Sequence, residues 1–205
     1  LGATAAPVPC RIAGTVMRLL LPLLALPLAV PSAPPPAPAQ VGVPASPFLM
    51  VDEARLRGVE FRQTNFATEM KYPFETLGGA VAAFDFDDDG WVDLLFLNGA
   101  PSPEHVRRDP ATFNRLFRNK GDGRFVDVTA DSGLSGAGIK GYPQGVAVGD
   151  YDNDGYPDVL VTNYGDNVLY RNDGNGHFSD VTARAGVAMP AHALKASAAF
   201  LDYDN

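Results

Sequence analysis

The residues best suited to chemistry are aspartates that recur at fixed spacing in two short loops, residues 85–93 and 150–158. Both loops read Asp-x-Asp-x-Asp-Gly-x-x-Asp, which turns the side chains at positions one, three and five toward one point, while the glycine permits a sharp bend. Hard oxygen ligands arranged in this way suit calcium. The expected ligands are Asp85, Asp87, Asp89, Asp93 and the Trp91 carbonyl in the first loop, and Asp150, Asp152, Asp154, Asp158 and the Tyr156 carbonyl in the second. A third loop of the same kind begins at Asp202 and Asp204.

Two other interpretations of these loops compete with a calcium site of this type. An EF-hand needs a bidentate acid at position twelve and a helix on each side, but position twelve is Phe96 in one loop and Val161 in the other, and both flanks are strand-like. We therefore reject the EF-hand and dockerin interpretations. The remaining alternative is Asx-type turns without metal, which we disfavour because four converging carboxylates would repel one another without a cation.

The loops belong to a longer internal repeat. Residues 116–134 align without gaps with a second segment at an offset of 53 residues, and eleven of the nineteen positions are identical. A period of about 50 residues indicates a supersecondary module that stacks beside its neighbours. In the first module we expect four β-type runs, at residues 81–86, 92–97, 115–118 and 124–128, and extra residues at 101–112.

Turn residues and apolar runs indicate how the strands pair and pack. Residues 119–123 and 172–176 supply Asn and Gly that tolerate positive φ, which predicts tight β-hairpins. The runs at 94–97 and 159–161 are continuously apolar and are expected to be buried on both faces between neighbouring modules. Four short strands per module are typical of a propeller blade. We therefore predict an all-β fold, a partial β-propeller with about three four-stranded blades.

The N-terminal region has the layout of an export signal. From Met17 the order is one positive residue, a leucine-rich apolar run at 19–30, and small residues before Gln40. The run falls short of the ~20 residues that a membrane-spanning helix needs. We expect upstream sequence at 1–16, a signal peptide at 17–39, a Pro-rich linker at 40–54, and propeller repeats at 55–205 that are truncated at the C-terminus.

Charge and cysteine content limit the partners. The net charge of -8 repels phosphate backbones and anionic membrane surfaces, so we expect no nucleic-acid partner and no membrane insertion after signal cleavage. Cys10 is the sole cysteine and precedes Met17, which leaves no disulfide framework in an exported protein.

The repeated motif resembles a known family. Residues 79–90 and 145–155, each followed by an Asp-Leu-Leu or Asp-Val-Leu run, resemble the FG-GAP (VCBS-type) repeats of integrin-like β-propellers. Residues 58–61 and 72–79 are similar to the leading segment of proteins of the cartilage acidic protein type, which often carry a C-terminal ASPIC/UnbV domain. The resemblance covers roughly residues 55–205. It implies a seven-bladed propeller, calcium in the blade loops, export, and a role in adhesion or ligand display.

Groups for catalysis are sparse. The three histidines are scattered, and no nucleophile elbow, zinc-protease motif or phosphate-binding loop occurs. We expect no enzymatic activity in this region. Arg118 and Arg171 recur beside the hairpin asparagines, and a structural hydrogen bond within each blade is favoured over ligand binding. Trp91 and Tyr156 are expected to pack at a blade edge, with an aromatic ligand contact as the alternative.

These observations predict a secreted, extracellular or periplasmic calcium-binding repeat protein with a structural, adhesive or ligand-binding role toward an unknown protein or glycan. One alternative is a carbohydrate-binding propeller, or the propeller part of a polysaccharide-acting enzyme, which is motivated by the two loop aromatics. A further alternative is an enzyme whose catalytic domain lies beyond residue 205.

Overall fold

The computed structural model describes residues 50–189 and 193–201. The predicted signal peptide, the segment before it, most of the linker, and the aspartates of the third loop lie outside these residues. The chain divides into two units, residues 1–49 and 50–205, and the description below concerns the second unit.

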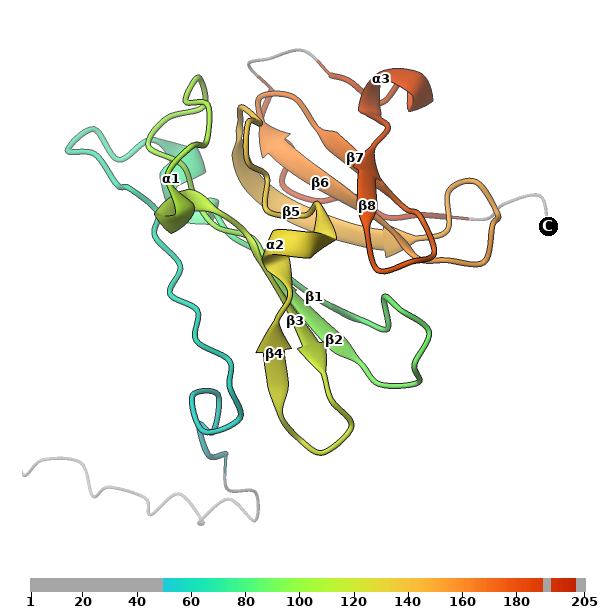
Figure 1. Cartoon of the computed structure of the whole chain (residues 1–205). Coiled ribbons are helices and arrows are strands. Elements are labelled where there is room, and N and C mark those ends of the chain that lie inside the picture. The colour runs from blue at the N-terminus through green and yellow to red at the C-terminus, as the bar shows by residue number, and fades with distance from the viewer. Residues whose placement is uncertain (1–49, 190–192, 202–205) are drawn as a thin grey trace, which may run out of the picture. The chain divides into compact units, whose positions relative to one another are not determined.

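Two four-stranded antiparallel sheets make up the described unit (Figure 1). In each sheet the strands follow one another in chain order, as in a propeller blade. Sheet A contains β1 (Val81–Phe84), β2 (Asp93–Phe96), β3 (Arg115–Asn119) and β4 (Phe125–Asp127). Sheet B contains β5 (Tyr142–Gly149), β6 (Asp158–Tyr164), β7 (Val168–Asn172) and β8 (Phe178–Asp180). The all-β prediction and the expected strands of the first module are confirmed.

Each sheet ends in the predicted tight hairpin. The backbone N–H of Lys120 donates to the Arg124 carbonyl at 2.9 Å, and the equivalent bond in sheet B joins Asp173 to His177 at 2.8 Å. Two glycines in each turn have positive φ, which a residue with a Cβ adopts only at a cost. The Asn and Gly positions of the repeat therefore specify the turns that pair the outer two strands.

A single helical turn follows the last strand of each sheet and was not expected from the sequence. These turns are α2 (Thr129–Ser132) and α3 (Thr182–Ala185), and each ends at a glycine in the left-handed conformation. The threonine that begins each turn recurs in the repeat because it has a structural role. Its hydroxyl accepts a hydrogen bond from the backbone of the neighbouring strand, at 2.9 Å in sheet A and 3.0 Å in sheet B.

Two further elements lie outside the sheets. The helix α1 (Pro73–Leu77) places Phe74 among three tyrosine rings, with the Tyr164 ring centroid 4.7 Å away. This aromatic group joins the segment that leads into sheet A to the strands of sheet B. The extra residues of the first module form a connection between β2 and β3 that contains the 3₁₀ helix η1 (Pro110–Thr112), where the sequence placed them.

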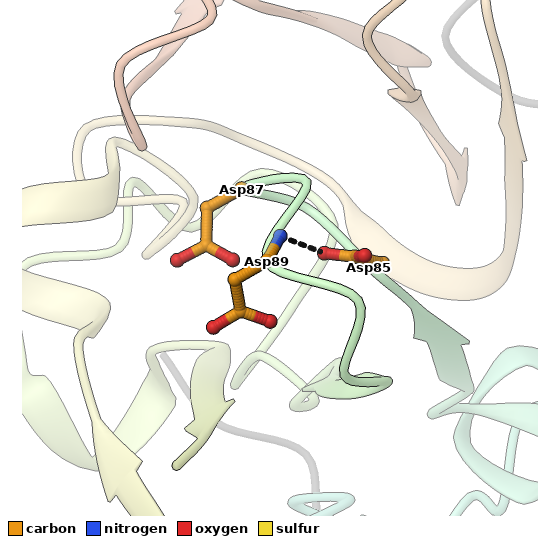
Figure 2. Close-up of side chains that lie close together, drawn as sticks. All are labelled: Asp85, Asp87 and Asp89. Carbon is orange, nitrogen blue, oxygen red and sulfur yellow. Dashed lines mark hydrogen bonds between the residues drawn. The ribbon is translucent and has the colours of Figure 1, made fainter. Parts of the chain in front are cut away.

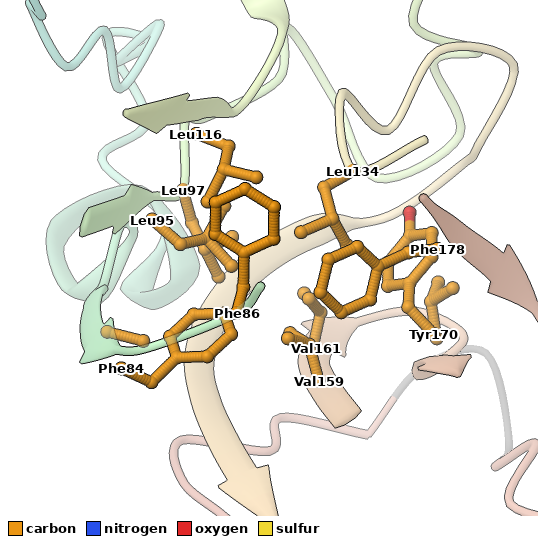
Figure 3. Packing of buried hydrophobic residues seen from close by; sticks show 12 residues of the cluster. Phe84, Phe86, Leu95, Leu97, Leu116, Leu134, Val159, Val161, Tyr170 and Phe178 are labelled. Atoms are coloured by element: carbon orange, nitrogen blue, oxygen red, sulfur yellow. The ribbon is translucent and has the colours of Figure 1, made fainter. Parts of the chain in front are cut away.

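The hydrophobic core lies between the two sheets (Figure 3). Leu95 and Leu116 of sheet A and Val159 of sheet B are fully buried there. The side chains that alternate with them, such as Leu94 and Leu160, are only partly buried. The continuous apolar runs are therefore buried fully on one face and partly on the other, because successive side chains of a strand point to opposite faces and the second faces have lighter cover.

Residues 193–201 pack on the face of sheet B that points away from sheet A. No strand is assigned within this short stretch, so the described residues hold two complete four-stranded sheets. A Cβ placed on Gly149 would lie 2.5 Å from the Phe200 ring, and one placed on Gly145 would lie 2.6 Å from the Ala196 carbonyl oxygen. The two glycines thus leave room for the segment to approach β5 closely. Within the described residues, none of the helices has the length and apolar character needed to cross a membrane.

Candidate metal centre

Both aspartate loops connect the first two strands of their sheets, so the paired strands fix their ends. In the first loop Asp85 accepts hydrogen bonds from the backbone N–H groups of positions five and six, at 3.2 and 2.8 Å. In the second loop Asp150 accepts the equivalent bonds at 3.1 and 2.8 Å. The first aspartate of each loop therefore holds the loop closed on itself.

Backbone conformation explains the glycine at position six. Gly90 and Gly155 have φ of 84° and 92°, in the region that favours glycine. The residues at position four, Asp88 and Asn153, also have positive φ, at 57° and 61°, which Asp and Asn tolerate better than most residues. Two left-handed residues in each loop wrap the chain around the carboxylates of the odd-numbered positions.

Three carboxylates converge in each loop. Asp85, Asp87 and Asp89 each offer an oxygen within 4.8 Å of the others, and Figure 2 shows these three side chains in the bend of the first loop. In the second loop the group within the same limit is Asp150, Asp152 and Asp158. Each group contains three of the four aspartates expected from the spacing, and these clusters could hold a metal ion.

One buried oxygen in the first loop stands out. The Asp87 side chain is 17% exposed, and its Oδ1 is a buried atom without a hydrogen-bond partner among the described residues. Burial raises the pKa of Asp87, Arg118 opposes that rise, and the neighbouring carboxylates of Asp89 and Asp85 add to it. A buried oxygen acceptor that lacks a donor, beside two more carboxylates, fits a hard cation.

The aspartate at position nine links its loop to the third strand of the same sheet. Asp93 and Asp158 are fully buried. Asp93 accepts one backbone N–H from Phe86 in its own loop at 3.0 Å and another from Asn119 at the end of β3 at 2.7 Å. Asp158 accepts the equivalent bonds, from Tyr151 at 2.8 Å and Asn172 at 2.7 Å. Burial raises the pKa of both aspartates, and these backbone donors lower it in part.

Asp89 and Asp154, at position five, accept the backbone N–H of the loop aromatic two residues later, both at 3.0 Å. The aromatics themselves lie over the hairpin turns. A Cβ on Gly121 would lie 2.7 Å from Nε1 of Trp91, and a Cβ on Gly174 would lie 2.7 Å from the Tyr156 ring. The packing role expected for these aromatics therefore has a structural basis, although Trp91 is 51% exposed.

The recurring arginines differ between the blades. Arg118 Nε lies 2.8 Å from Asp87 Oδ2, and its Nη2 lies 3.2 Å from Asp89 Oδ2. Arg171 instead pairs with Asp173 in its own hairpin, with 2.5 Å between Nη2 and Oδ1. Both arginines interact within their own blade, as expected, but the contact of Arg118 with the first loop was not predicted from the sequence.

Sequence reasoning also missed the residues that connect the first loop to sheet B. Phe86, at position two, is 3% exposed and lies against Phe178, with ring centroids 6.3 Å apart. Asn172 of β7 donates to the Phe86 carbonyl at 2.8 Å. The available signal was that position two is aromatic in both loops, Phe86 and Tyr151, although it is not a ligand position.

Comparison with known proteins agrees with this repeat structure. The FG-GAP-like repeat family matches residues 85–161 and 150–205, which together span more than half of the chain. The chain belongs to the FG-GAP-like repeat family. It is also similar to cartilage acidic protein 1 of Xenopus tropicalis, with 34% identity over 96 residues. That alignment covers 45% of this chain and 14% of the length of the relative.

Proposed function

We propose that this protein is an exported calcium-binding repeat protein, in which the ions sit in the blade loops and stiffen a surface used for adhesion or ligand binding. The proposal assigns no catalytic role to this region. The observation that carries it is the first loop, where three carboxylates converge and the buried Asp87 Oδ1 has no donor within the part of the chain that the structure describes. A cation would supply that missing partner.

The donor chemistry favours calcium among the common metals. Both clusters contain only aspartate oxygens, without the histidine or cysteine that zinc and other transition metals prefer. Calcium accepts six to eight oxygens in flexible geometry, which carboxylates, main-chain carbonyls and water can complete. We assign Asp85, Asp87, Asp89, Asp93 and the Trp91 carbonyl to the first site, and Asp150, Asp152, Asp154, Asp158 and the Tyr156 carbonyl to the second. Asp202 and Asp204 would begin a third.

Calcium in the first loop would stabilise the contact between the blades. The loop is tied to sheet A through Asp93 and to sheet B through Phe86 and Asn172. An ion that fixes the positions of Asp85 and Asp87 also fixes Phe86 between them. Without a cation, the neighbouring negative charges favour a looser loop.

A thermal-unfolding titration of the full chain tests the proposal. Calcium at about 100 times its dissociation constant should stabilise the fold by about 2.7 kcal/mol, which corresponds to a rise in melting temperature of roughly 5–10 °C for a unit of this size. EDTA should reverse the rise. No response to either, together with no calcium by elemental analysis, would refute calcium binding.

A matched pair of variants makes the titration specific. Asp87→Asn removes the charge of the carboxylate with the unpaired buried oxygen and should reduce the calcium-dependent rise. Asp122→Asn removes the same charge from an exposed hairpin position whose side chain accepts the Arg124 backbone N–H at 3.0 Å. This control should leave the rise unchanged.

The proposal also includes the location of the protein and the kind of partner that it binds. The apolar run and cleavage-like residues at 17–39 support a signal peptide, so we propose an extracellular or periplasmic location. The net charge of -8 favours a protein or glycan partner over nucleic acid. Expression of the complete gene followed by N-terminal sequencing of the protein tests cleavage. A protein retained with residues 17–39 intact would contradict export by this route.

The half-exposed Trp91 ring supports a second candidate function, carbohydrate binding. A glycan array probed with the protein and with Trp91→Leu tests this candidate. Binding that the substitution abolishes, while folding is retained, would favour it. An array without signal would favour a protein partner.

A further inference from the structure

The equivalent arginines of the two blades contact different acids. Arg118 lies on two oxygens of the first loop, Asp87 Oδ2 at 2.8 Å and Asp89 Oδ2 at 3.2 Å. Arg171 instead makes its direct contacts with Asp173, through Nε at 3.2 Å and Nη2 at 2.5 Å, and interacts with Asp152 of the second loop only as a more distant charge. A guanidinium therefore pairs directly with aspartates of the first loop, while the equivalent guanidinium pairs with a hairpin acid outside the second loop.

One residue of the hairpin accounts for this difference. The position after the hairpin asparagine is Asp173 in sheet B but Lys120 in sheet A. Asp173 also accepts a hydrogen bond from Ser179 at 2.6 Å and lies 3.2 Å from the His177 ring nitrogen. The first blade has Lys120 there, which offers Arg118 no carboxylate to pair with. Arg118 is thus free to pair with the loop.

We propose that Arg118 is an internal competitor for metal at the first loop, so that the two sites have unequal affinity and the first fills only at higher calcium concentration. This inference rests on the proposed calcium binding. A metal ion at the first loop would share the carboxylates of Asp87 and Asp89 with Arg118, which contacts their Oδ2 atoms, and its positive charge would repel the guanidinium, so binding weakens or displaces the Arg118 pairs. The second loop binds first and is the structural site.

Because the first loop contacts sheet B, its weaker calcium affinity affects the contact between the blades. Phe86 follows Asp85 directly, is buried against sheet B, and has its carbonyl bonded to Asn172. Exchange of Arg118 for calcium therefore occurs beside the contact between the blades. The first site can adjust that contact over a range of calcium concentration in which the second site is already filled.

The first loop can be observed selectively. Trp91 is the sole tryptophan of the chain and lies at position seven of this loop. Terbium replaces calcium in oxygen-ligand sites, and its luminescence is sensitised by a nearby indole. Terbium titration of the full chain with tryptophan excitation therefore reports the first site, and calcium competition then gives its calcium affinity. Isothermal titration with calcium alone reports both sites and should resolve two affinities.

Four variants test the competition. Arg118→Gln should tighten the first site on the order of tenfold, and Lys120→Asp should do the same by giving Arg118 an alternative partner. Asp173→Asn should weaken the second site because Arg171 is released toward its loop. Arg115→Gln is the matched control, since Arg115 lies on the same strand but pairs with Asp127 at 3.7 Å, and should change neither site.

The outcomes separate this inference from the proposed function. Absence of any calcium or terbium binding refutes the proposed function itself. Two sites of equal affinity, or an unchanged first site in both Arg118→Gln and Lys120→Asp, refute the competition while leaving calcium binding intact. Tightening in Lys120→Asp alone still supports the inference if Arg118→Gln fails to fold, which circular dichroism detects.

Discussion

The two blades share one backbone scheme but use different side chains where each blade meets the next. In both blades a buried aspartate accepts two backbone N–H groups, and a threonine hydroxyl accepts one from the neighbouring strand. At the position before the loop, however, sheet A has Phe84 and sheet B has Gly149. The backbone contacts are the invariant part of the repeat, and the facing side chains are specific to each interface.

At each interface a large side chain faces a smaller residue, but the large one comes from the preceding sheet at the first interface and from the following segment at the second. Phe84 is 8% exposed in the core between the sheets, on which the smaller Val148 of sheet B also packs. Beyond sheet B the large residue comes from the next segment, as Phe200, and the glycine of β5 makes room for it. Such complementary pairs make each blade fit its own neighbour better than another blade would.

The largest expected loss of stability comes from removing the buried aspartate that accepts backbone N–H groups in each blade. Asp93→Ala and Asp158→Ala each leave two buried backbone N–H groups without an acceptor, so each should lower the free energy of unfolding by about 3 kcal/mol. Chemical denaturation of the full chain in EDTA measures this loss apart from metal binding. A large loss for one substitution and none for the other would break the equivalence of the blades.

A somewhat smaller loss of stability tests whether Gly149 is needed to make room for Phe200. Gly149→Ala places a Cβ against Phe200 and should cost about 1–3 kcal/mol through overpacking. Adding Phe200→Ala should recover part of that loss, because the second substitution removes the clash. Denaturation of the two single variants and the double variant completes the cycle. Strict additivity would show that these residues do not determine the fit.

The hairpin glycines should behave alike in the two blades. Gly121→Ala and Gly174→Ala each introduce a Cβ at positive φ, 2.7 Å from the loop aromatic, and should cost about 1–2 kcal/mol. Trp91→Gly should reduce the cost at Gly121, since the strain from the ring is gone while the strain in φ remains. An unchanged cost in that double variant would indicate that the ring does not limit the site.

The smallest effect is a pH dependence that distinguishes the two hairpins. The hydrogen bonds from Ser179 and Arg171 lower the pKa of Asp173 to about 2. Because the folded pKa lies below the unfolded one, the stabilisation is present above pH 4 and is lost as the pH falls toward about 2. Asp173→Asn should therefore lower stability at pH 7, by under about 1 kcal/mol, and have little effect near pH 2.

Lys120→Asn is the control for this pH dependence, since it alters the equivalent residue of the first hairpin without adding or removing an acid. Its effect on the melting temperature should be the same at pH 2.5 and at pH 4.5. A pH-dependent loss of equal size in both variants would mean that the acid of the second hairpin has no special role.

Sequence reasoning predicted the sheets well because their signals are local. Hairpin turns need Asn and Gly, and the strands between them are short apolar runs, so strand positions followed from single segments. The helical turns α2 and α3 escaped it because four residues carry too little periodicity to identify a helix. The aspartate spacing likewise predicted where carboxylates converge, and three of the four expected in each loop do so.

The sequence by itself determined the repeat, the short strands with their tight hairpins and the clustering of aspartates, since each depends on residues close together in the chain. Only the tertiary structure decided that Arg118 pairs with the first loop, that Asp93 and Asp158 accept backbone donors from distant strands, and that Phe86 is buried against sheet B. These contacts join residues between 14 and 92 positions apart, and their partners are selected by the packing of whole sheets. The spacing of residues along the chain therefore does not indicate which distant residues will pack together.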